Sequence, residues 1–285
     1  MDSAYRVQTC AKNSFCEALC WQIAKHYLSL KRCCHINPRY ATMKQTIQVR
    51  CKNNNQTIDV ATGSSLAEVY NLTGLEMAYG PICAKVNNKV EGMHYRLYHS
   101  KDLEFLDMHS GSGSRNYTRT LFFILSKAVH DLYPGSEVVI DIPVSNGYYV
   151  DLQIGHAVEL DDVDNIRRRM QEIIDAHYPI TRHEVPTEDA VKMFEEKGDE
   201  AKVKLLRSAG TLYTTYYQID DYVDYFYGSL LTNTSKIYLF GLEKYFDGLL
   251  LRIPDLKFPG VLPEMTHTRT RCLRYSRSTT AGRRY

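Results

Sequence analysis

The sequence has no apolar run long enough to cross a bilayer. A membrane-spanning helix needs roughly 20 consecutive apolar residues. The N-terminus also has no basic segment followed by an uninterrupted apolar stretch, which a secretory signal requires. The chain has 285 residues, of which 44% are hydrophobic and 24% charged, as in globular proteins. We therefore predict a cytoplasmic protein with no membrane partner.

A phosphate-binding loop is also absent. The chain contains no Gly-Lys dipeptide, and therefore no Gly-x-x-x-x-Gly-Lys-Ser/Thr motif, in which backbone amides and a lysine surround the phosphates of ATP. The Gly/Ser segment 110–114 has neither the lysine nor a preceding strand, and we interpret it as a linker. The chain itself is expected to bind no ATP, no Mg and no other cofactor.

Cysteine is scarce in the middle of the chain. Only Cys51 and Cys83 lie between residues 43 and 258, whereas five cysteines crowd the first 34 residues and one lies in the C-terminal tail. Two isolated thiols suggest a reducing compartment. The spacing of the N-terminal cysteines fits no zinc ribbon or finger, so we expect no metal.

Charge divides the chain in the same way. Residues 43–258 carry 23 Lys and Arg against 30 Asp and Glu, a net charge of −7, whereas the two flanks carry 12 basic and 3 acidic residues. Binding to polyanions depends on clustered Lys and Arg. An acidic body is therefore not expected to bind tRNA. The flanks 1–42 and 259–285 are predicted to be unstructured, since the basic tail has no apolar periodicity.

Residues 43–109 have the pattern of a small β-grasp, ubiquitin-like domain. Strands are predicted at 46–51 and 57–60 from their alternation, and further strands at 82–86 and 103–106. A helix is predicted at 66–72, where Ser65 and Glu68 form a capping box.

Residues 115–258 are expected to form a second, α+β domain. A helix that is apolar on almost every face, residues 121–132, must be buried. Strands at 137–142 and 147–152 precede an amphipathic helix at 161–178, and Thr187 is the predicted N-cap of another helix. The stretch 213–245 holds eight tyrosines. These favour half-buried sheet positions, with base stacking as the alternative.

Short motifs in both regions occur in the order found in one family. The first region contains Ala-Lys-Val-Asn at 84–87 and Asp-Leu-Glu-Phe-Leu-Asp at 102–107. The second contains Leu-Tyr-Pro-Gly at 132–135, Asn-Gly-Tyr-Tyr-Val-Asp at 146–151 and Arg-Met-Gln-Glu-Ile-Ile at 169–174. The pair resembles the TGS domain and the editing-like (SAD) domain of threonyl-tRNA synthetases.

The resemblance implies four site positions, and none carries the residue the family uses. An editing domain places two histidines one helical turn apart, then a cysteine and a histidine four residues apart. This chain has Arg119 and Phe123 at the first pair, and Phe226 and Leu230 at the second. Phe and Leu offer no lone pair, and Arg is a permanent cation. We predict no catalytic site here. Arg119 is either an anion ligand or, as we favour, an outward, solvated residue.

The same degenerate pair also resembles the N-terminal half of bacterial nucleoside kinases related to uridine kinase. That resemblance implies a non-catalytic regulatory or substrate-presenting module, truncated before its P-loop domain. Its partners would be the missing C-terminal kinase domain and a small nucleoside or nucleotide, with ATP and Mg needed only by that domain. Two alternatives remain open. One is a free-standing tRNA-binding or aminoacyl-tRNA-editing homologue of threonyl-tRNA synthetase, and the other is a structural module.

Overall fold

A computed structural model of the protein describes residues 45–264. The predictions for 1–42 and for the N-terminal cysteines lie outside the described residues, as do residues 265–285 of the tail predicted to be unstructured from 259. Residues 259–264 of that tail are described, and the prediction was wrong for them: the Val261 backbone N–H donates to the Phe258 carbonyl, and the Asp255 N–H donates to the Val261 carbonyl. Residues 46–264 lie within one compact unit, and all contacts discussed below lie within it. No described helix combines the length and the apolar character that crossing a membrane requires.

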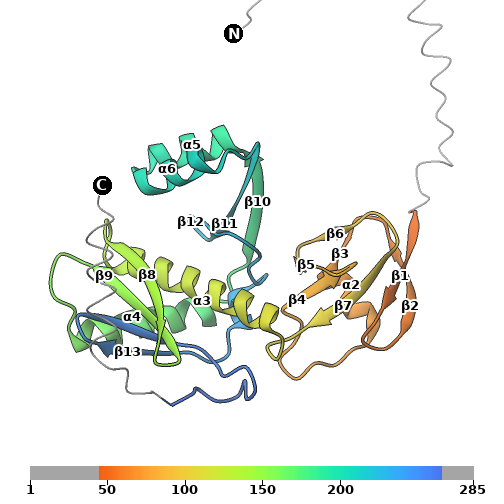
Figure 1. The fold of residues 1–285 in the computed structure, drawn as a ribbon, viewed down its shortest axis with the longest axis horizontal. Coiled ribbons are helices and arrows are strands. Elements are labelled where there is room, and N and C mark those ends of the chain that lie inside the picture. Colours follow the sequence, from red (N-terminus) through yellow and green to blue (C-terminus); the bar gives the residue numbers. More distant parts are fainter. Residues whose placement is uncertain (1–44, 265–285) are drawn as a thin grey trace, which may run out of the picture. The chain divides into compact units, whose positions relative to one another are not determined.

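The first part of the fold is a five-stranded mixed sheet with one helix (Figure 1). Its strands, in spatial order, are β2 (Gln56–Ala61), β1 (Thr46–Cys51), β7 (Lys101–Leu106), β4 (Cys83–Val86) and β5 (Lys89–Gly92). Only the central pair β1 and β7 is parallel. The short strands β3 (Ser64–Ser65) and β6 (Arg96–Leu97) pair separately. Helix α2 (Leu66–Thr73) follows β3.

Local sequence signals explain this part well. Both hydrogen bonds of the Ser65/Glu68 capping box form, and Gly74 closes α2 at a φ of 64°. The alternation in β1 places Val49 and Cys51 in the core, where they join Leu66 and other apolar side chains. The predicted strands and helix are therefore confirmed.

Helix α3 (Gly111–Leu132) corrects the linker interpretation of residues 110–114. Ser110 is the N-cap, and its hydroxyl accepts a hydrogen bond from the Gly113 backbone N–H at 2.9 Å. A Cβ on Gly113 would lie only 1.9 Å from the carbonyl oxygen of Asp107. Glycine is needed here because two backbone segments approach closely, and not because the segment is flexible. The linker prediction was wrong.

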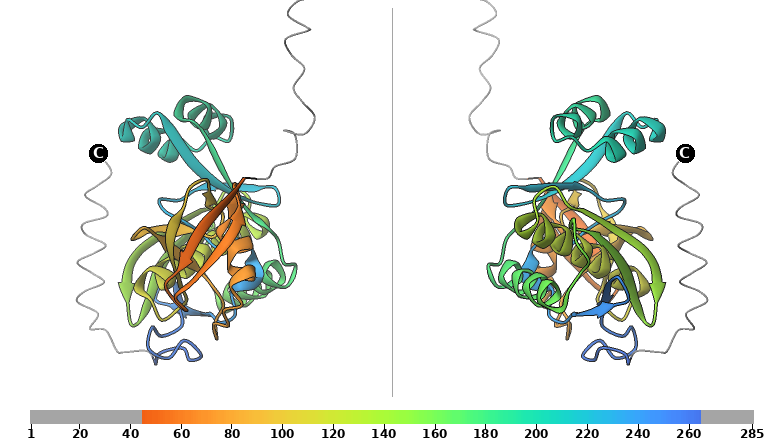
Figure 2. Two further views of the ribbon diagram at one scale, coloured as in Figure 1. Left: turned by 90° about the vertical axis from the view of Figure 1, so that its right-hand side faces the viewer. Right: turned by 90° about the vertical axis from the view of Figure 1, so that its left-hand side faces the viewer.

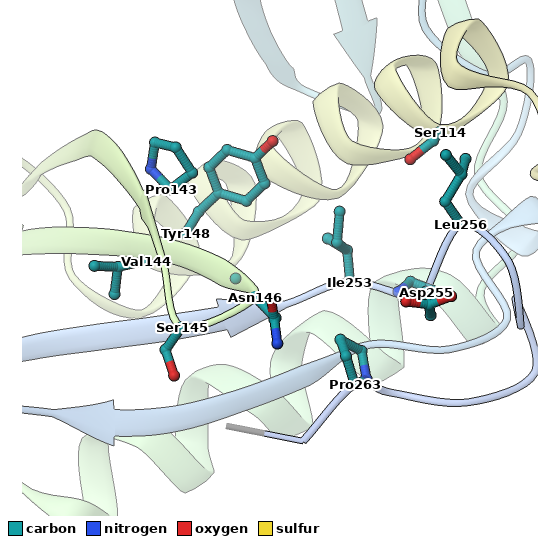
Figure 3. A pocket seen from close by; sticks show the side chains of 12 residues that line it. Ser114, Pro143, Val144, Ser145, Asn146, Tyr148, Ile253, Asp255, Leu256 and Pro263 are labelled. Atoms are coloured by element: carbon teal, nitrogen blue, oxygen red, sulfur yellow. The ribbon is translucent and has the colours of Figure 1, made fainter. Parts of the chain in front are cut away.

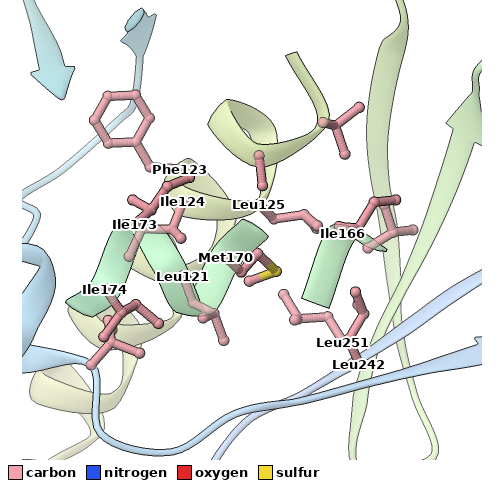
Figure 4. Close-up of a cluster of buried hydrophobic side chains, with 14 of the residues drawn as sticks. Leu121, Phe123, Ile124, Leu125, Ile166, Met170, Ile173, Ile174, Leu242 and Leu251 are labelled. Atoms are coloured by element: carbon pink, nitrogen blue, oxygen red, sulfur yellow. The ribbon is translucent and has the colours of Figure 1, made fainter. Parts of the chain in front are cut away.

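The largest core lies between α3, helix α4 (Leu160–Asp175) and a four-stranded antiparallel sheet. The sheet runs in the order β13 (Gly241–Tyr245), β14 (Gly248–Arg252), β9 (Gly147–Gln153) and β8 (Glu137–Val144). Figure 4 shows side chains of α3 and α4 meeting those of β13 and β14. The apolar stretch of α3 is mostly buried, as predicted, although Leu132 at its end is 38% exposed. Helix α4 ends earlier than predicted, because the chain turns at His177, whose φ is 53°.

The third sheet is antiparallel and carries a helical hairpin. Strand β10 (Ile180–Pro186) pairs with β11 (Tyr213–Ile219), which pairs with β12 (Tyr222–Tyr225). Helices α5 (Thr187–Glu196) and α6 (Glu200–Ala209) pack at one end of β10 and β11 (Figure 2). Pro186 is the N-cap of α5 and Thr187 its first helical residue, so the predicted cap was one residue late.

The tyrosine-rich stretch follows the favoured prediction for the most part. Four of its eight tyrosines are half-buried and Tyr217 is fully buried, whereas Tyr213, Tyr227 and Tyr238 are exposed. A short 3₁₀ turn, η2 (Thr234–Lys236), leads back to β13. With helices and mainly antiparallel sheets in separate segments, the architecture is α+β, as expected from the sequence.

Candidate functional site

The positions predicted to replace an editing site lie along one contact, between helix α3 and the segment 226–231 that follows β12. The rings of Phe123 and Phe226 meet edge to face, with their centroids 5.3 Å apart and an interplanar angle of 60°. Phe123 and Leu230 are completely buried. Apolar side chains therefore occupy two of the positions where an editing domain needs polar groups.

Arg119 is held at the same contact. Its Nη1 donates hydrogen bonds to the backbone oxygen of Ser229 at 2.8 Å and to Oδ1 of Asn116 at 3.0 Å. The guanidinium lies against Gly228, where a Cβ would be 2.4 Å from Nη1. The favoured prediction of an outward, solvated arginine was therefore wrong: Arg119 is half-buried, because the glycine leaves room for it.

Two further hydrogen bonds fasten the segment 228–231. The backbone N–H of Leu231 donates to Oγ1 of Thr120 at 2.9 Å, and the hydroxyl of Tyr217 donates to the carbonyl of Gly228 at 2.9 Å. Both side chains are buried. These hydrogen bonds join the segment 228–231 to α3 on one side and to β11 on the other.

At pH 7 the charged side chain that acts on Arg119 is Arg115, because Tyr217 and Cys83 are neutral. Burial lowers the pKa of Arg119, and the like charge of Arg115 acts in the same direction, against the opposing effect of Tyr217. Burial also raises the pKa of the nearby Cys83 thiol to about 11, so Cys83 is a neutral thiol at pH 7. Neither group is prepared as a base or a nucleophile.

A buried ion pair between α6 and β12 was missed by sequence reasoning. Nζ of Lys202 on α6 lies 2.7 Å from Oδ1 of Asp224 on β12 and 2.8 Å from Oδ2 of Asp199. The hydroxyl of Tyr222 donates to Oδ2 of Asp224 at 3.1 Å. The Asp199 cap of α6 and its partner three residues later were legible in the sequence, but the pairing with Asp224 is tertiary.

Lys202 stays protonated, and therefore positively charged, at pH 7. Burial disfavours the ammonium, but the charges of Asp224 and Asp199 outweigh it, so the pKa of Lys202 lies above its ordinary value. Burial and Asp224 together raise the pKa of Tyr222. A lysine that stays protonated and a tyrosine that stays neutral cross-link elements and do not transfer protons at pH 7.

A pocket of about 460 Å³ lies elsewhere in the fold (Figure 3). It is bounded by the turn between β8 and β9, the start of α3 and the segment after β14, with Ser114, Asn146, Tyr148, Ile253 and Leu256 among its lining residues. None of Arg119, Phe123, Phe226 and Leu230 lines it. Among residues 45–264, no group of three or more His, Cys, Asp and Glu side chains is placed to hold a metal ion.

Comparison with known proteins finds similarity to threonine–tRNA ligases. The chain is 29% identical over 181 residues to the threonine–tRNA ligase of Acetivibrio thermocellus, which covers 63% of this chain and 28% of the relative. It is 32% identical over 171 residues to the ligase of Syntrophotalea carbinolica, covering 59% and 27%. No protein-family model matches.

The similarity concerns part of each relative. For the threonine–tRNA ligase of Syntrophomonas wolfei it reaches 28% identity over 193 residues, which is 67% of this chain and 30% of the ligase. The chain thus spans less than a third of the length of these relatives. A region similar to threonyl-tRNA synthetases makes up about 60% of the chain, and these relatives give no support to a uridine kinase parent.

Proposed function

We propose that the chain is a tRNA-binding module related to threonine–tRNA ligases, with an editing-like site that does not hydrolyse. Two observations taken together support the proposal. The chain is similar to these ligases, yet Arg119, Phe123, Phe226 and Leu230 stand at the positions where the resemblance implies ligands for a metal or a water. A retained scaffold with a changed site suits recognition without catalysis.

The proposed module has two domains. The first, residues 43–109, is a TGS-like β-grasp domain built on the sheet β2-β1-β7-β4-β5. The second is the editing-like domain predicted for 115–258, whose start we now place at Ser110, the N-cap of α3. We expect it to act in the cytoplasm, where tRNA is aminoacylated.

The absence of hydrolysis follows from side-chain chemistry. Ester hydrolysis needs a base or a metal ion to activate a water. Phe123 and Leu230 are buried and have no lone pair. Arg119 is a cation that donates to the Ser229 backbone oxygen, so it can neither accept a proton nor bind a divalent metal. The proposed module therefore binds an aminoacylated tRNA and leaves its ester intact.

The net charge of −7 led us to predict against a tRNA partner, whereas the relatives are named for tRNA. Net charge alone does not decide binding, because phosphate contacts depend on local clusters of cations. Arg115 and Arg119 lie one turn apart on α3 and influence each other electrostatically. Binding through a few such contacts has a shallow salt dependence.

Fluorescence anisotropy with a labelled threonine tRNA tests the proposal. The full chain is expected to bind at 50 mM salt with a Kd on the order of 10⁻⁶ M and to weaken moderately at 200 mM. The double variant Arg115→Gln/Arg119→Gln should bind more weakly than the control variant Arg168→Gln. Aminoacylated tRNA incubated with the chain should lose its ester no faster than in the buffer control. No binding at 50 mM salt, or deacylation above that rate, refutes the proposal.

A second candidate is the front half of an ATP-dependent nucleoside kinase. It is favoured by the replacement of the residues at all four editing-like positions, because the editing histidines are typically absent in that group. The segment 245–254 also favours it. The relatives reported above do not support it. It predicts an in-frame Gly-x-x-x-x-Gly-Lys-Ser/Thr motif downstream at the locus, and sequencing that finds none in any frame rejects it.

A further inference from the structure

Arg119 is a half-buried cation without a carboxylate partner. Among residues 45–264, no Asp or Glu oxygen lies within 4 Å of its guanidinium, and the charged side chain that influences it is Arg115, which has the same sign. Other buried cations of the fold are compensated: Lys127 pairs with Asp131 and Asp221, and Lys202 with Asp199 and Asp224. Burying an unpaired charge is costly, so an anion bound at Arg119 would compensate the charge of the guanidinium.

Asn116 supplies a second, independent observation. This side chain is 1% exposed, and its Nδ2 is buried with no hydrogen-bond partner in the described part of the chain. Its Oδ1 accepts from Arg119, and a guanidinium has only donors, so turning the amide over would place donor against donor. The orphan is therefore the amide nitrogen, and it lacks an acceptor.

His94 lies near the same segment but supplies no donor. Its hydrogen bond with the Leu231 backbone raises its pKa, so a ring N–H donates there, whereas burial lowers the pKa below the ordinary value and leaves the ring neutral. The buried Nε2, which has no partner within residues 45–264, is therefore a lone pair and not a ligand for an anion. The unpartnered donor beside Arg119 is the Asn116 amide.

We propose that Arg119, with Arg115 and Asn116 beside it, binds a phosphate group. Two guanidinium groups match the charge of about −1.5 to −2 on a phosphomonoester better than the single charge of a carboxylate. The amide of Asn116 supplies a neutral donor for a further oxygen. The phosphate source is inorganic phosphate, a mononucleotide or the end of an RNA. This site stands on the geometry around Arg119 and does not rest on tRNA binding.

Isothermal titration of the full chain tests the proposal. The four ligands are inorganic phosphate, uridine 5′-monophosphate, a short RNA with a 5′-phosphate, and acetate. Phosphate-bearing ligands should bind, and the tightest of the three identifies the source. Arg119→Gln should weaken this binding about tenfold or more, as expected for the loss of a charge-assisted hydrogen bond. Arg115→Gln changes an exposed residue, so it leaves folding intact and should weaken binding severalfold.

The matched control is Arg168→Gln. Arg168 on α4 donates to Asn165, three residues before it, just as Arg119 donates to Asn116, but the Arg168 pair is exposed. Its substitution should leave phosphate affinity unchanged. Absence of phosphate binding, equal losses in the Arg119 and Arg168 variants, or acetate binding as tightly as phosphate overturns the proposal. Phosphate binding without tRNA binding would leave this site standing and remove only the proposed function.

Discussion

Breaking the Lys202–Asp224 ion pair is expected to destabilise the third sheet and its helical hairpin. The pair joins α6 to β12 at 2.7 Å, and the Asp224 side chain is only 8% exposed. Lys202→Met leaves a buried carboxylate whose remaining partners are the Tyr222 hydroxyl and the Tyr225 backbone N–H. Removing one partner of a buried pair costs about 3 to 5 kcal/mol.

The expected cost is lower here for two reasons. Lys202 is 27% exposed, so water screens part of the interaction, and Asp224 keeps two hydrogen bonds. We therefore expect Lys202→Met to lower the free energy of unfolding by about 2 to 3 kcal/mol. Asp224→Asn should cost less, about 1 to 2 kcal/mol, because Lys202 retains Asp199 at 2.8 Å.

Urea unfolding of both single variants and of Lys202→Met/Asp224→Asn, followed by circular dichroism at pH 7, measures the coupling. Since the pKa of Lys202 is raised above its ordinary 10.5, the pair's contribution is fully present at pH 7 and is lost only as the pH rises through the folded-state value. The double variant should be more stable than additivity predicts, by about 1 to 2 kcal/mol.

A surface pair is the control for this cycle. Arg167 and Asp164 are 2.7 Å apart, but their side chains are 56% and 58% exposed. Their coupling should be about 0.5 kcal/mol or less. If the coupling of Lys202 with Asp224 is no larger than this, burial does not strengthen the pair and the argument is refuted.

Two further predictions concern backbone conformation and pH. Gly228→Ala should cost about 2 to 3 kcal/mol, because a φ of +102° is strained for alanine and its Cβ would collide with Arg119. Gly210→Ala, at a φ of +61° with open space around it, should cost only about 1 kcal/mol, and equal costs would count against the collision. Burial, reinforced by Asp162, raises the pKa of Tyr133 from 10.0 to about 12. The contribution of Tyr133 is therefore present below pH 10 and lost as the pH rises toward 12. Urea unfolding should show wild type more stable than Tyr133→Phe at pH 8, by about 1 kcal/mol, and a smaller gap at pH 11; a constant gap would contradict this.

The elements that the sequence predicted correctly depend on contacts between near neighbours in the chain. The capping box of α2 joins Ser65 and Glu68, three residues apart, and the alternation of β1 follows from the two-residue period of a strand. Both patterns are visible in any window of a few residues. The α+β class and the buried character of α3 followed from such patterns alone.

One error arose where distant segments meet: Arg119 turns inward over Gly228, which lies far along the chain. Other errors were local. Gly113 lies in the first turn of α3, close to the Asp107 backbone, and a Gly/Ser run carries no sign of that close approach. Thr187 was placed as a cap, although Pro186 at the end of β10 fills that position. In these two local cases the composition was compatible with either outcome.

By itself, the sequence determined which side chains stand at the four editing-like positions, and therefore that the lone pairs needed for hydrolysis are missing there. Only the tertiary structure decided what replaced them. It buries Phe123 and Leu230, turns Arg119 inward over Gly228, and brings Lys202 to Asp224 from another element. The reason is physical: residue identity sets the available chemistry, whereas burial and charge compensation depend on neighbours that the fold brings from far along the chain.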